Sequence, residues 1–170
     1  MFEMMNTLWG MLCCSSCSVI CKLTIAMVGI LSGGSIFLIF IIQYNNYNAS
    51  LWGFITAIFS FCVFHLNYLY LKNKIDEWYT PDNLENLKLL GLIVCLSSLV
   101  AFGVYLSLFI TRKQDMFDMY GYNYFPAIIF SFLSIKSGLL LYGTARHYKK
   151  YVILCNPQFI YDRKPITSDH

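Results

Sequence analysis

Long uninterrupted stretches of hydrophobic residues dominate the chain, and short polar segments separate them. Four such runs cover about residues 22–42, 51–71, 89–110 and 125–146. Each reaches the length of about 20 residues that a helix needs to cross the hydrocarbon core of a bilayer. The pattern predicts an all-α membrane protein that forms one four-helix transmembrane domain over residues 1–170, with a basic tail at 147–170.

Composition narrows the class of protein further. The chain is 58% hydrophobic and 12% charged, whereas about a quarter of the residues in an average soluble domain are charged. A soluble enzyme is therefore not expected. The net charge of +3 is too small for the basic patches of a nucleic-acid binder, so we expect no nucleic-acid partner. Because Met1–Leu12 lacks the basic segment of a cleavable signal peptide and the first run is long enough to span, we expect this run to be retained as the first helix.

The basic residues in the short connections predict the orientation in the membrane. An excess of Lys and Arg marks the cytosolic side. If the N-terminus is cytosolic, only Arg112 and Lys113 lie on the opposite side, and the nine cytosolic residues are Lys22, Lys72, Lys74, Lys88, Arg146, Lys149, Lys150, Arg163 and Lys164. The bias predicts that both termini are cytosolic.

Local motifs indicate how the helices begin and pack. Thr80 followed by Pro81 is typical of a helix start, so the third helix is expected to begin there, before the membrane is reached. Small residues four positions apart allow close helix packing. They occur in the first, third and fourth runs, as the pairs Gly29/Gly33, Gly103/Ser107 and Ser134/Gly138.

Lys136 is the one charged residue well inside an apolar run, near the middle of the fourth. Intramembrane charges usually face a cavity or a partner. We therefore expect Lys136 to meet an anionic substrate inside the bundle, the alternative being a structural lysine bonded to carbonyls or a tyrosine. Leu140, Gly143 and His147 share its helical face, so a ligand at Lys136 can extend along this face.

His65 is the only histidine inside a predicted span. Its helical face also carries Phe54, Phe61, Cys62, Tyr68 and Lys72. This face combines flat aromatic surface, a metal ligand and a cation at its end. The opposite face, with Gly53, Thr56, Ser60 and Asn67, is expected to serve packing and interhelical hydrogen bonds. A lone buried histidine is more often a satisfied polar residue than a ligand, so metal ligation stays open at this point.

Cysteines crowd the start of the first helix, at Cys13, Cys14, Cys17 and Cys21. Acylation beside the membrane, a thiolate metal site and a purely structural role are the alternatives. The chain has no HExxH or GxSxG motif and no carboxylate pair inside the membrane, so no enzymatic chemistry is expected.

Several segments between residues 35 and 159 resemble the heme-responsive gene family of heme transporters, solute carrier family 48. They are Ser35-Ile36-Phe37-Leu38, Phe64-His65-Leu66-Asn67-Tyr68, Ile110-Thr111-Arg112-Lys113-Gln114, Ser131-Phe132-Leu133-Ser134-Ile135-Lys136 and Thr144-Ala145-Arg146-His147-Tyr148. The resemblance covers residues 35–159 of the 170. It implies four spans, cytosolic termini and movement of heme from the exoplasmic or lysosomal side into the cytosol.

The resemblance also implies roles for particular residues. It makes His65 the heme ligand of the second helix and the segment from Thr144 to Tyr148 a heme-receiving motif. Two departures stand out. The motif has Thr144 where the family has Phe and His147 where it has Lys. Lys113 stands where some relatives have His, so Lys113 itself and Tyr120, Tyr122 and Tyr124 are candidates to replace that histidine.

Heme chemistry fits these residues. Heme is a flat apolar disc whose iron accepts an axial His or Tyr ligand, and its propionates pair with Lys or Arg. We expect uptake near Lys113 and Tyr122, ligation by His65 beside Tyr68, a propionate at Lys136, and release at Arg146, His147 and Tyr148. Because four helices enclose little room for heme, we also expect a homo-oligomer, in the plasma membrane or an endosomal or lysosomal membrane.

Two other functions remain open. A small tetraspan scaffold or accessory subunit without a transported ligand predicts that His65 and Lys136 can be replaced without loss beyond folding. A membrane thiol redox protein that uses Cys14 and Cys17 predicts thiol-dependent turnover and an exoplasmic N-terminus.

Overall fold

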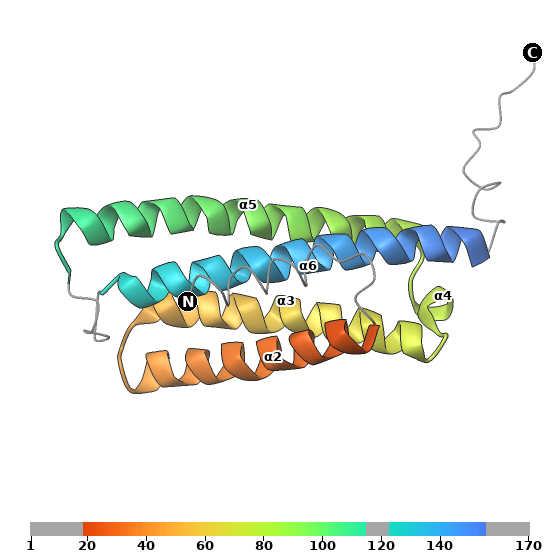
Figure 1. The fold of residues 1–170 in the computed structure, drawn as a ribbon, viewed down its shortest axis with the longest axis horizontal. Coiled ribbons are helices and arrows are strands. Elements are labelled where there is room, and N and C mark those ends of the chain that lie inside the picture. The colour runs from red at the N-terminus through yellow and green to blue at the C-terminus, as the bar shows by residue number, and fades with distance from the viewer. Residues whose placement is uncertain (1–18, 115–122, 156–170) are drawn as a thin grey trace, which may run out of the picture.

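A computed structural model describes residues 19–114 and 123–155, and these residues form helices without any strand. The helices are α2 (Val19–Ile42), α3 (Tyr47–Leu71), the single-turn α4 (Ile75–Trp78), α5 (Pro81–Thr111) and α6 (Phe125–Cys155) (Figure 1). All except α4 are long and apolar enough to cross a membrane. The expectation of an all-helical chain with four helices able to span a membrane is confirmed for the described residues, and the orientation of the ends stays a prediction.

Capping residues explain where the helices start. Thr80 Oγ1 accepts a hydrogen bond of 3.3 Å from the Asn83 amide, and Pro81 occupies the first turn of α5, as the sequence predicts. Asn46 caps α3 in the same way, because its side-chain oxygen accepts a bond from the Ala49 amide. At the other end of the chain α6 continues to Cys155, so residues 147–155, assigned from sequence to a tail, are helical.

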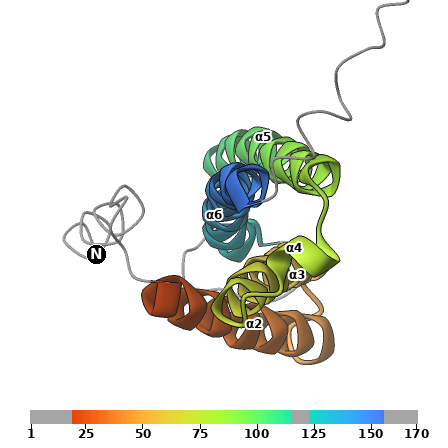
Figure 2. The same cartoon turned by 90° about the vertical axis from the view of Figure 1, so that its right-hand side faces the viewer.

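The four long helices stand in an open row in the order α2, α3, α6, α5 (Figure 2). Each hairpin packs along its own length, α2 against α3 and α5 against α6, and contact between α3 and α6 joins the hairpins. The two central helices run in the same direction, with α4 at their C-terminal ends (Figure 1). The outer helices α2 and α5 consequently leave most of their apolar surface exposed to surrounding lipid or to partners.

Glycines mark the crossing point of each hairpin. A Cβ added to Gly33 of α2 would lie 2.8 Å from the Gly53 carbonyl and the Ala57 amide of α3. A Cβ added to Gly91 of α5 would lie 2.9 Å from the Gly138 carbonyl of α6. Glycine at these positions lets the backbones approach closely. The predicted packing roles of Gly33 and Gly138 are confirmed, whereas a Cβ added to Gly103 meets no atom of the described residues within 4 Å, so Gly103 makes no close helix contact among them.

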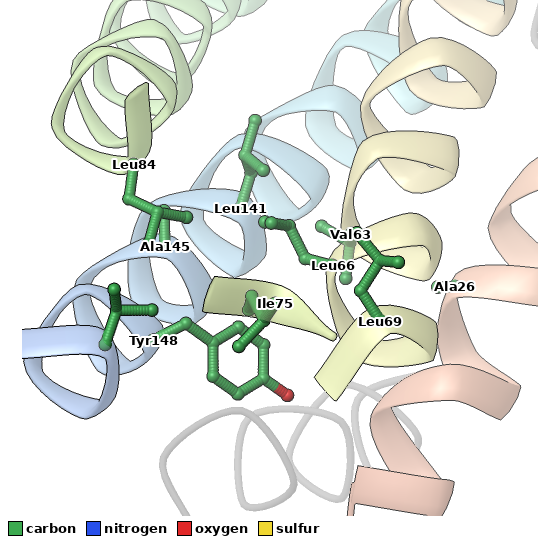
Figure 3. Packing of buried hydrophobic residues seen from close by; sticks show 10 residues of the cluster. Ala26, Val63, Leu66, Leu69, Ile75, Leu84, Leu141, Ala145 and Tyr148 are labelled. Atoms are coloured by element: carbon green, nitrogen blue, oxygen red, sulfur yellow. The ribbon is translucent and has the colours of Figure 1, made fainter. Parts of the chain in front are cut away.

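Buried side chains from α3, α4, α5 and α6 meet near α4 (Figure 3). Ile75 of α4 and Leu84 of α5 are fully buried there, next to Leu66, Leu141 and Tyr148. Buried hydrogen bonds also join α3 to α6, among them one of 3.2 Å that Ser134 Oγ donates to the Trp52 carbonyl. Thr56 and Ser134 share one of 2.8 Å, and Tyr148 donates one of 2.7 Å to Asn67. The polar face of α3 thus makes interhelical hydrogen bonds, as predicted.

Candidate functional site

His65 lies on the side of α3 that faces away from both α2 and α6. Its neighbours at helical spacing, Phe61 and Tyr68, are exposed, whereas Val63 and Asn67 point into the row and are fully buried. This division follows from the helical periodicity of about 3.6 residues. The face of α3 that carries His65 also carries Phe54, Phe61, Tyr68 and Lys72, as predicted. Cys62 instead packs against the core.

Aromatic rings surround the imidazole. His65 stacks against Phe61 with ring centroids 6.3 Å apart, and it meets Trp78 and Tyr79 edge-on at 6.1 and 6.0 Å. Phe61, His65, Tyr68, Trp78 and Tyr79 together are called the His65 surface below. Trp78 is 63% exposed, Phe61 56% and Tyr68 45%. The His65 surface is therefore an open aromatic face and not an enclosed pocket.

The segment after α3 brings Trp78 and Tyr79 to this face. Asn73 adopts a positive φ of 51°, a conformation that asparagine tolerates better than most residues, and it turns the chain at the end of α3. Ile75 then anchors α4 in the core with no exposed surface. With Ile75 fixed, the next turn places Trp78 and Tyr79 beside His65. Neither residue was expected at this face from the sequence, although adjacent aromatics just beyond a span are a typical interfacial signal.

A hydrogen bond orients the imidazole. His65 Nδ1 lies 3.2 Å from the Tyr79 hydroxyl. Burial, and secondly the nearby Cys62, raise the pKa of Tyr79, so its phenol stays protonated at neutral pH. When Nδ1 carries the imidazole proton it donates to Tyr79 Oη, and Nε2 keeps its lone pair for a metal. A partner of this kind fixes the ring orientation of metal-binding histidines.

The surroundings favour one kind of metal over others. Within residues 19–114 and 123–155, no three His, Cys, Asp or Glu side chains come together to hold an ion. A bare zinc or iron ion needs three or four such ligands. The iron of a porphyrin has four equatorial ligands already and needs only an axial one. The single imidazole of the His65 surface therefore fits a porphyrin metal better than a free ion.

A cation lies beside the Tyr68 ring of the His65 surface. Lys72 caps α3, and its Nζ lies 5.9 Å from the centre of the Tyr68 ring. Lys72 is exposed, so its ammonium can reach an anionic group bound over Tyr68.

Lys136 is not part of the His65 surface. It lies on α6 opposite the buried residues of that helix, on the same side as the exposed Gly143 and His147. Its Nζ sits 4.9 Å from the centre of the Phe132 ring. The hydrogen bonds between α3 and α6 set the two helices side by side so that Lys136 lies next to the part of α3 about seven residues before His65. The two residues are therefore roughly 10 Å apart along the helix axes. Lys136 therefore points out of the row, and not into it as expected.

The other expected site residues are divided between the two ends of the long helices. Arg146 and His147 are exposed near the α4 end, whereas Tyr148 is buried, stacked on Tyr70 at 4.6 Å and bonded to Asn67. Lys113 is exposed at the opposite end, just after α5. Tyr122 and Tyr120, and with them Cys13, Cys14 and Cys17, lie outside the described residues. Tyr148 thus serves helix packing, and the remaining residues do not converge on one pocket.

Comparison with family models, curated proteins and solved structures found no match to this chain. The described residues thus form four helices able to span a membrane, with an exposed aromatic and imidazole face on α3. The resemblance to heme transporters stays a prediction based on the residues quoted above.

Proposed function

We propose that this protein binds heme on the His65 surface and carries it across the membrane, from the exoplasmic or lysosomal side into the cytosol. The observation that supports the proposal most is the imidazole held by Tyr79 among Phe61, Tyr68 and Trp78. The proposal assigns no enzymatic step to the protein, and heme is its cargo.

Each element of the His65 surface matches one part of the heme. Nε2 of His65 is the axial ligand of the iron. The rings of Phe61 and Trp78 pack against the porphyrin, an apolar contact with a preferred stacking geometry. Lys72 pairs with a propionate through a charge-assisted hydrogen bond.

An open site suits transport. A carrier must bind its cargo well enough to take it up and weakly enough to release it. Heme on the His65 surface keeps one porphyrin face uncovered, and we propose that a second copy of the chain or lipid covers it. We propose that Lys113 and Tyr122 receive heme on one side of the membrane. Arg146 and His147 then release it on the other side.

Transport is tested in proteoliposomes that enclose an apo-peroxidase, with hemin added outside. Because hemin also crosses lipid unaided, protein-free liposomes set the background. The wild-type protein is expected to speed the gain of trapped peroxidase activity severalfold over this background, and His65→Ala is expected to return it to background. Phe54→Leu is the matched control, since Phe54 lies on the same face of α3 about 16 Å from His65. Equal rates for wild type and His65→Ala would refute the proposal.

A further inference from the structure

The Lys136 face of α6 carries a second feature that heme binding at His65 does not use. Lys136 is the eleventh residue after Phe125, where α6 begins, so its Cα lies about 16 Å along the helix. This depth corresponds to the middle of a hydrocarbon layer about 30 Å thick. The side chain lies half-buried on the face of α6 opposite its buried residues, and among the described residues its recorded polar or ring contact is with the Phe132 ring.

Among the described residues, the Lys136 ammonium has no recorded ion pair. None of the nine acidic residues falls in the four apolar runs, and Asp82 and Glu85 lie in the first turns of α5. Nζ reaches back by about one helical turn to Phe132, which is still about 10 Å short of the start of α6. Lipid headgroups at that end are therefore beyond its reach. The apolar runs of a second copy of this chain bring no carboxylate to this depth either.

The same face allows another helix to approach. Gly143 lies seven residues after Lys136, two turns along the same stripe. Gly143 is exposed, and a Cβ added to it would have no atom of the described residues within 4 Å. Exposed glycines let helices pack closely in membranes, and polar groups stabilise the contact.

We propose that the Lys136 face of α6 binds a membrane-spanning helix of another protein that carries a carboxylate near the bilayer centre. The carboxylate pairs with Lys136, and the partner's backbone packs over Gly143. Charge complementarity distinguishes this surface from the exposed apolar faces of α2 and α5, which surrounding lipid covers equally well.

The test uses a synthetic leucine-rich helix with one Asp at its centre. The labelled helix and the labelled full-length protein are reconstituted together in neutral phosphatidylcholine vesicles, and energy transfer between them is titrated. The Asp helix is expected to associate roughly tenfold more tightly than a matched helix with Leu at that position. Lys136→Leu should abolish this difference and Lys136→Arg should keep it, while Gly143→Leu should weaken both helices' binding.

Controls distinguish this proposal from other occupants. Lys136→Leu removes no hydrogen bond or ion pair recorded among the described residues, so unchanged circular dichroism and melting temperature are expected. Equal binding of the Asp and Leu helices, or an Asp preference that survives Lys136→Leu, would overturn the proposal. Self-association that depends on Lys136 while the Asp helix does not compete with it would also overturn it, in favour of a second copy as the partner.

Discussion

Tyr148 of α6 donates a hydrogen bond of 2.7 Å to the side-chain oxygen of Asn67 on α3, and both side chains are buried almost completely. Asn67 also donates to the Val63 carbonyl at 2.7 Å, and the Tyr148 ring stacks on Tyr70. This pair joins the two hairpins near α4, and it holds α3 in place behind His65.

Tyr148→Phe should therefore lower stability, because it leaves the Asn67 oxygen buried without its donor. Interhelical hydrogen bonds in membranes contribute about 0.6 kcal/mol on average and up to about 1.7 kcal/mol. The expected loss is about 1 kcal/mol in the free energy of unfolding, measured by titration with a denaturing detergent. Tyr70→Phe is the control, since it keeps the stacked ring and removes a hydroxyl for which the described residues show no hydrogen bond. Equal losses for the two variants would contradict the assigned role of the pair.

Close glycine contacts at the hairpin crossings lead to a second prediction. Gly33→Val inserts atoms against the Gly53 carbonyl and the Ala57 amide of α3. Overpacking of this kind typically costs about 1–3 kcal/mol. Gly103→Val makes the same change where the structure has open space. A lower melting temperature is expected for Gly33→Val and not for Gly103→Val, and the reverse order would show that the helices pair through other faces.

Trp78 provides a third prediction, about affinity. It is highly exposed and meets the His65 ring edge-on, so its role on the His65 surface is contact with a ligand more than support of the core. Aromatic pairs contribute about 0.5–1.5 kcal/mol beyond burial. Trp78→Leu should weaken hemin binding by about 2- to 12-fold, as measured by titration of the hemin absorbance, while Phe54→Leu should leave it unchanged. Equal affinities for Trp78→Leu and wild type would remove Trp78 from the site.

The Tyr79 hydroxyl allows a fourth prediction. Tyr79→Phe removes the partner of His65 Nδ1 and keeps the ring. Loss of such a partner typically costs about 10- to 100-fold in metal affinity. The dissociation rate of hemin should rise accordingly, as followed by stopped-flow transfer to an excess of a heme acceptor protein. An unchanged rate would show that the hydrogen bond does not support ligation.

The fold was largely predictable from sequence because bilayer thickness sets the length of each span. Thr80 and Pro81 gave the start of α5 correctly, since capping depends on local backbone geometry. The order of the row was not predictable, because small pairs such as Gly29/Gly33 and Gly103/Ser107 look alike in sequence. Only the packed structure distinguishes Gly33, which packs closely against α3, from Gly103, which approaches no other helix closely among the described residues.

The site was predictable only in part, because the sequence of one helix does not show which neighbours it packs against. Helical periodicity correctly groups Phe61 and Tyr68 with His65, because residues of one helix share faces by geometry alone. It does not reveal whether a face points into the row or out of it, so Lys136 was placed inside when it lies outside. Trp78 and Tyr79 reach His65 through the turn at Asn73 and the burial of Ile75, which are tertiary features.

Ligation of heme iron by His65 is the central claim, and a spectroscopic titration tests it most directly. Purified protein in detergent is titrated with hemin, and the Soret band is recorded for wild type, His65→Ala, His147→Ala and His170→Ala, which cover all three histidines of the chain. The account predicts a saturable, shifted Soret band that is lost only in His65→Ala. A band that survives His65→Ala, or one that is lost in His147→Ala instead, would contradict it.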